Sequence, residues 1–73
     1  MKTIDLINGI KDILEIEDQV VELDTPLHIS SLGTLSLIVF IDENFDKQFK
    51  ASELREVNTI GDLVKLIGKE YFV

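Results

Sequence analysis

No cysteine occurs in the 73-residue chain, so neither disulfide bonds nor thiolate-bound metals can stabilise its fold. A chain of this length buries only about 60% of the surface that its unfolded form exposes, so its stability must come from one small hydrophobic core. Apolar residues make up 45% of the sequence, which is ordinary for a globular domain and too much for a disordered segment. We therefore expect residues 1–73 to form a single folded domain.

Charge is unevenly distributed along the chain. Fourteen acids oppose seven bases, which gives a net charge of −7. Nine of the acids fall between Asp12 and Asp46, where no lysine or arginine occurs. Such a field repels nucleic acids and anionic membrane surfaces and favours proteins with basic patches as partners. The charge thus excludes a DNA-binding function, although acidity that serves only solubility is an equally good explanation of it.

The N-terminal segment has no apolar core of the kind that a secretory signal needs. Asp5, Asn8 and Lys11 interrupt its apolar residues. Apolar runs elsewhere are far too short to span a membrane. We expect a cytoplasmic protein that does not insert into membranes.

Helical periodicity is clear at the start of the chain. Residues 3–15 are predicted to form a first helix with Thr3 as its N-cap. Its apolar stripe consists of Ile7, Ile10 and Leu14, flanked by Leu6 and Ile13. Gly9 interrupts this helix at a cost of about 1 kcal/mol relative to alanine.

Residues 15–28 change character, with five acids, one proline and no steady period. Pro26 disfavours helix at the residue before it. We predict a long ordered loop that Ile16, Val21 and Leu27 hold against the core. Loops of this length in small domains usually have a function.

The segment from Ser30 to Phe45 is open to two interpretations. Its centre, Leu35–Ile41, is rich in β-branched residues and could form a buried strand of a small α+β domain. As a helix, it has one core-facing stripe, formed by Thr34, Leu37, Ile38, Ile41 and Phe45. That phase leaves four more apolar residues on the flanks and the outer face: Leu32, Leu35, Val39 and Phe40. We favour the helix, whose surplus apolar residues indicate that it docks another molecule.

Two further helices are predicted after Phe45. A short one spans Ser52–Val57, with Ser52 as its N-cap. The last begins at Thr59, whose spacing to Asp62 is that of a capping box. Its apolar stripe consists of Ile60, Leu63, Val64 and Ile67. The expected fold is therefore all-α, with three longer helices and one short helix.

No catalytic or metal-binding pattern stands out. His28 is the only histidine, and although Asp24 and Ser31 lie near it in sequence, a triad also needs a preorganised pocket and an oxyanion hole. A lone histidine in an acidic loop is typical of a surface residue. The loop lacks the alternating ligands of an EF-hand, and no glycine-rich phosphate loop occurs. We expect neither an enzyme nor a metal site.

The pair Ser31-Leu32 opens a more specific comparison. The segment resembles the acyl carrier protein family, whose modified serine lies in Asp-Ser-Leu at the start of the second helix; here Ser30 replaces the aspartate. The similarity continues without a gap to Ile67, through a helix that closes on acidic residues and Phe45 and through the Thr59-Ile60-Gly61-Asp62 start of the last helix.

The resemblance implies a four-helix bundle of the acyl-carrier type. It also implies that Ser31 carries a covalent 4′-phosphopantetheine arm, which makes the chain a phosphoprotein that holds acyl groups as thioesters. A phosphopantetheinyl transferase would attach the arm. Acyl-transferring, condensing or ligating enzymes of fatty-acid, polyketide or related lipid biosynthesis would then use the carrier as a monomer.

Partner docking is expected on the second helix. Leu32, Leu35 and Val39 lie off the core stripe, and Asp42 and Glu43 follow one turn later, so basic patches on partners would complement the acids. The alternative function uses the same surface: an unmodified interaction module that docks a partner through this helix, with Ser31 serving only as the helix cap.

Overall fold

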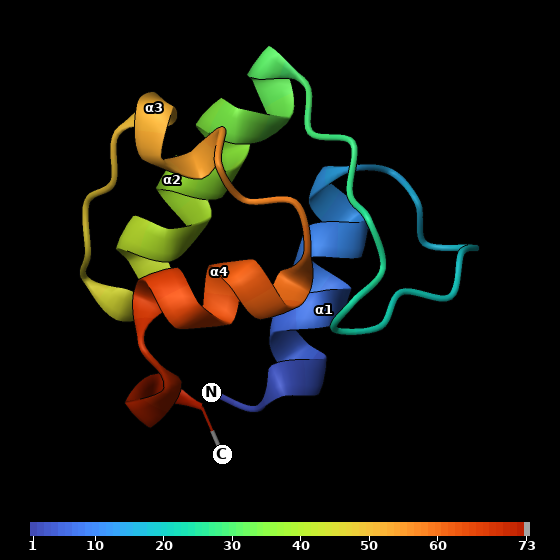
Figure 1. Cartoon of the computed structure of the whole chain (residues 1–73), viewed down its shortest axis with the longest axis horizontal. Helices are drawn as coiled ribbons and strands as arrows, with labels where there is room; N and C mark the ends of the chain where they lie inside the picture. Colours follow the sequence, from blue (N-terminus) through green and yellow to red (C-terminus); the bar gives the residue numbers. More distant parts are fainter. Residues whose placement is uncertain (73) are drawn as a thin grey trace.

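The structure is a computed structural model that describes residues 1–72 (Figure 1). Its elements are α1 (Thr3–Ile13), α2 (Ser31–Phe45), α3 (Ala51–Leu54), α4 (Ile60–Ile67) and a final 3₁₀ turn, η1 (Lys69–Tyr71). Three longer helices and one short helix confirm the all-α prediction. The α+β interpretation is wrong, because the proposed strand Leu35–Ile41 lies within α2 and no strand occurs in residues 1–72.

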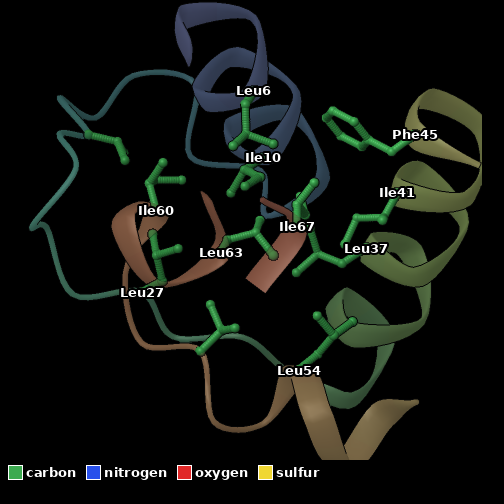
Figure 2. Packing of buried hydrophobic residues seen from close by; sticks show 12 residues of the cluster. Leu6, Ile10, Leu27, Leu37, Ile41, Phe45, Leu54, Ile60, Leu63 and Ile67 are labelled. Carbon is green, nitrogen blue, oxygen red and sulfur yellow. The ribbon is translucent and has the colours of Figure 1, made fainter. Parts of the chain in front are cut away.

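The core lies between the helices, and all four contribute to it (Figure 2). Eight large side chains are fully buried: Leu6, Ile10, Leu37, Ile41, Leu54, Ile60, Leu63 and Ile67. Burial of each such side chain stabilises the fold by about 1.5–3 kcal/mol. One compact cluster therefore holds the domain together, as the lack of cysteine requires.

The phase of α2 agrees with the prediction. Thr34, Leu37, Ile41 and Phe45 are buried, whereas Ile38 is only partly buried. The spacing of three and four residues places these side chains on one face of the helix. The β-branched residues of this segment favour a strand, but the packing of this face against the core favours the helix.

The predicted apolar stripe of α1 needs a correction. Leu6 and Ile10 are fully buried, whereas Ile7 and Leu14 are partly exposed. The buried face is thus centred on Leu6 and Ile10, so the prediction that Leu6 flanks the stripe is wrong. The N-cap is Lys2, without a side-chain hydrogen bond, rather than Thr3, and the helix ends at Ile13, two residues earlier than predicted.

Gly9 provides room on α1 for a side chain of α2. A Cβ atom added to Gly9 would lie 2.7 Å from both Cε2 and Cζ of Phe40. The missing side chain therefore lets the Phe40 ring of α2 approach the backbone of α1. Phe40 packs against the core as a partly buried side chain, instead of lying on the outer face of α2.

The segment between α1 and α2 is an irregular loop, as predicted. Val21 and Leu27 are buried and Ile16 packs against the core. Two backbone hydrogen bonds also attach the loop to the start of α4: the Leu27 N–H donates to the Asn58 carbonyl (2.7 Å), and the Gly61 N–H donates to the Leu23 carbonyl (2.9 Å). The loop is therefore held along its second half, directly before Ser31.

The helix α3 is shorter and begins earlier than predicted. It spans Ala51–Leu54, and its N-cap is Lys50 rather than Ser52. The Lys50 N–H donates to Oε1 of Glu53 at 3.0 Å. This carboxylate, in the first turn, satisfies a backbone donor at the helix start, which fixes the start before Ser52.

The N-cap of α4 is confirmed. Thr59 Oγ1 accepts a hydrogen bond from the Asp62 N–H at 3.1 Å. The Asp62 carboxylate accepts from the Asn58 N–H (3.1 Å), one residue before the cap. Ile60, Leu63 and Ile67 are buried as expected, and Val64 is partly buried.

Candidate functional site

Ser30 and Ser31 have different roles at the start of α2. Ser30 is the N-cap, and its Oγ accepts a hydrogen bond from the Gly33 N–H at 3.1 Å. Its carbonyl accepts from the Thr34 N–H (2.8 Å) and from the Thr34 hydroxyl (3.0 Å). Ser31 is the first residue of the helix and is exposed. The interpretation of Ser31 as the helix cap is therefore wrong, because Ser30 performs that role.

Gly33 brings the start of α2 close to the rest of the domain. A Cβ atom on Gly33 would lie 3.1 Å from Cδ2 of Leu14 and 3.3 Å from Cγ2 of Ile29. The first turn of α2 can thus pack tightly against the end of α1 and the end of the loop. Together with the Ser30 hydrogen bonds, this packing fixes the backbone that presents Ser31.

Two pockets lie beside this helix start. The smaller, of about 230 Å³, is lined by Ser31, Ile29, Thr34, Leu35, Ala51 and Arg55. The larger, of about 460 Å³, shares Ile29, Thr34 and Arg55 with it and extends to Leu54 and Asn58. Because they share three lining residues, the two pockets adjoin each other between α2, α3 and residues 27–30, and we refer to them together as the groove. A group attached to the Ser31 oxygen would have this groove next to it.

The outer face of α2 carries an apolar stripe. Leu32, Leu35 and Val39 have 77%, 58% and 54% of their surface exposed. Asp42 and Glu43 are also exposed and lie one turn beyond Val39. We call these five residues the α2 docking face. Ser31 lies near one end of this face, and the acids lie roughly 17–18 Å away along the helix at 1.5 Å per residue.

Charge on α2 is opposite to what stabilises an isolated helix. The first turn has no acid and the last turn has no base, while Asp42 and Glu43 lie near the C-terminal end. The helix macrodipole makes each such exposed acid unfavourable by about 0.3–1 kcal/mol. Helix stability therefore does not explain the positions of Asp42 and Glu43.

Salt should stabilise the domain. All nine acids between Asp12 and Asp46 are exposed, and no base intervenes in that stretch. Their mutual repulsion destabilises the fold, and about 0.10–0.15 M salt shortens its range to roughly 8–10 Å. We expect the melting temperature, followed by circular dichroism, to rise with added NaCl or millimolar Mg²⁺. A constant or falling melting temperature would contradict this expectation.

The structure also bears on the predictions for His28, for metal binding and for membrane spans. His28 is exposed, as predicted, and lines the larger pocket. Within residues 1–72, no group of three or more histidine, aspartate or glutamate side chains is arranged to hold a metal ion. None of the helices in this part of the chain has the length and apolar composition that a membrane crossing requires.

Arg55 is the groove residue that the sequence analysis missed. It follows α3 and lines both pockets. The helix α3 packs beside α2 (Figure 1), and Arg55 and Ser31 line the same pocket between them. The one sequence signal was that it is the only arginine in the chain.

Comparison with known proteins adds no relative. No protein-family model, no curated protein and no solved structure matches the chain significantly. The candidate site is therefore described by its geometry alone.

Proposed function

We propose that this protein is a carrier that holds acyl intermediates as thioesters on a 4′-phosphopantetheine arm attached to Ser31. The observation that carries the proposal is the position of the Ser31 hydroxyl. It lies on the exposed first residue of α2, outside the cap that Ser30 forms, and beside an open groove. A serine in this position is accessible to a modifying enzyme and is not needed by the fold.

Helix geometry also favours a phosphodiester at Ser31. The N–H groups of the first turn point toward the start of a helix, where the macrodipole stabilises negative charge. The Gly33 and Thr34 N–H groups are already used by Ser30, and no acid of α2 lies in its first turn. An attached phosphate would supply the negative charge that this end of α2 lacks.

The fold is compatible with a bundle of the acyl-carrier type, in which the protein supplies presentation while the arm carries the thioester. Enzymes that transfer, condense or ligate acyl groups would be the partners. Tethering raises the effective concentration of the acyl group at each docked enzyme. The chain itself would perform no catalysis, and its place in lipid or polyketide biosynthesis follows from this role.

The α2 docking face would bind these partners. Its exposed leucines and valine provide an apolar centre, and Asp42 and Glu43 provide an acidic rim. Apolar anchors mainly govern dissociation, whereas rim charges mainly govern association.

The same face supports the second candidate function, an interaction module that is not modified. Mass spectrometry after incubation with coenzyme A, Mg²⁺ and a broad-specificity phosphopantetheinyl transferase distinguishes the two.

Variants of the docking face should separate the effect of the apolar anchors on dissociation from the effect of the acids on association. We expect Leu35→Ala to weaken transferase binding by about 1–2 kcal/mol, as for an interface anchor, through faster dissociation. The double variant Asp42→Lys, Glu43→Lys should slow association and reduce its dependence on salt. Both rates can be measured by surface plasmon resonance.

Ile4→Ala is the matched control, because Ile4 is an apolar side chain on α1 that is 55% exposed. It should leave both rates unchanged. Circular dichroism of Leu35→Ala should show unchanged helicity, because Leu35 lies outside the buried cluster. Unfolding of this variant would mean that Leu35 belongs to the core and that the docking face is assigned wrongly.

A further inference from the structure

The groove beside Ser31 differs in charge from the rest of the molecule. The chain has fourteen acids against seven bases, yet no aspartate or glutamate lines either pocket of the groove. Arg55 lines both pockets and is the only lysine or arginine in their walls. In a protein with a net charge of −7, the walls of this groove thus carry one arginine and no carboxylate, which favours an anion over a cation there.

The backbone of Arg55 is held in place, and its side chain is exposed. Arg55 is the C-cap of α3, and its N–H donates to the Ala51 carbonyl at 3.0 Å. Leu54, directly before it, and Val57, two residues after it, are buried in the core. The guanidinium group is always charged and presents donors in a planar fork that matches the oxygens of a phosphate.

We propose that Arg55 is the phosphate-binding residue of this site and pairs with the phosphate group carried on the Ser31 oxygen. This inference rests on the proposed function, which supplies that phosphate. Ser31 and Arg55 line the same 230 Å³ pocket, and the phosphorus atom would be bonded directly to the Ser31 oxygen. A carboxylate at the far end of an acyl chain is a poorer candidate, because the length of the arm separates it from this pocket.

Phosphoserine incorporated at position 31 by an expanded genetic code tests the pairing without any transferase. Its second pKa, ordinarily about 6, can be followed by ³¹P NMR. Pairing with Arg55 favours the dianion, so we expect this pKa to be about 0.5–1 unit lower with Arg55 present than in Arg55→Gln. Arg55→Lys should retain part of the shift, because it keeps the charge but not the planar fork.

Two controls isolate the contribution of Arg55. Lys65→Gln removes the same charge from a residue outside the groove and should leave the phosphate pKa unchanged. His28 is the only other ionisable side chain in the groove walls, so the comparison is repeated in a His28→Gln background, where the shift should persist.

The outcomes separate this inference from the proposed function. Equal phosphate pKa values in the Arg55 and Arg55→Gln proteins would overturn the role of Arg55, even if the transferase modifies Ser31. Conversely, a lowered pKa that depends on Arg55 supports the phosphate site, even if every transferase fails and the carrier function is lost.

Discussion

Wild-type protein incubated with coenzyme A, Mg²⁺ and a broad-specificity transferase is expected to gain the mass of one phosphopantetheine, and Ser31→Ala is expected to gain none. The effect is all or none because the arm is attached through the Ser31 oxygen. Since Ser30 rather than Ser31 caps α2, Ser31→Ala should keep the stability of the wild type. Loss of modification in this variant would therefore report chemistry and not unfolding.

Ser30 variants provide the matched control for this experiment. Ser30→Ala keeps the Ser31 hydroxyl and should still be modified, but it loses the cap to the Gly33 N–H. That loss costs about 1 kcal/mol and lowers the melting temperature by roughly 4–8 °C in a domain of this size. Ser30→Asp keeps a capping oxygen and also restores the aspartate of the acyl-carrier motif. If neither the wild type nor Ser30→Asp is modified by several transferases, the unmodified interaction module is the better description.

Ile41→Ala is expected to lower the free energy of unfolding by about 2–5 kcal/mol, which is a large fraction of the stability of a domain this small. Ile41 is fully buried, so its truncation leaves a cavity in the core (Figure 2). Val39→Ala, two residues earlier on the exposed face of α2, should change stability by less than about 0.5 kcal/mol. Urea unfolding followed by circular dichroism measures both values. A similar loss in the two variants would show that Val39 and Ile41 do not lie on opposite faces.

The parts of the fold that could be predicted are those determined by local pattern. The buried stripe of α2 follows from the spacing of Leu37, Ile41 and Phe45. The start of α4 follows from the Thr59 cap, which needs only its own first turn. In both helices, local sequence and tertiary packing favour the same arrangement, so sequence was sufficient.

The errors lie where packing between helices decides. Apolar residues surround much of α1, so several phases are compatible with its sequence, and the phase that buries Leu6 and Ile10 is the one in which the Phe40 ring lies beside Gly9. The start of α3 was misplaced because Ser52 is a strong N-cap residue, whereas the Glu53 carboxylate satisfies the N–H of Lys50 instead.

In the candidate site, too, some features follow from local pattern and others from packing between helices. The exposure of Leu32, Leu35 and Val39 could be inferred from helical phase, and the motif led to the prediction of Ser31 as the modified residue. Which of two adjacent serines caps α2 depended on the hydrogen bonds of one turn. The place of Arg55 in the groove depended on a contact between α2 and α3 that no local pattern encodes.

The contact between Gly9 and Phe40 also limits how α2 can move. Gly9 is the only residue of α1 that lacks a side chain. If α2 rotated about its own axis, the Phe40 ring would move away from Gly9 and toward the side chains of other α1 residues. Sliding by one turn would likewise bring the ring against Asp5 or Ile13. The contact therefore favours one orientation of α2, and with it the direction in which the exposed side chains of Leu32, Leu35 and Val39 point. If a partner binds these side chains, it would meet a surface whose orientation this packing already favours.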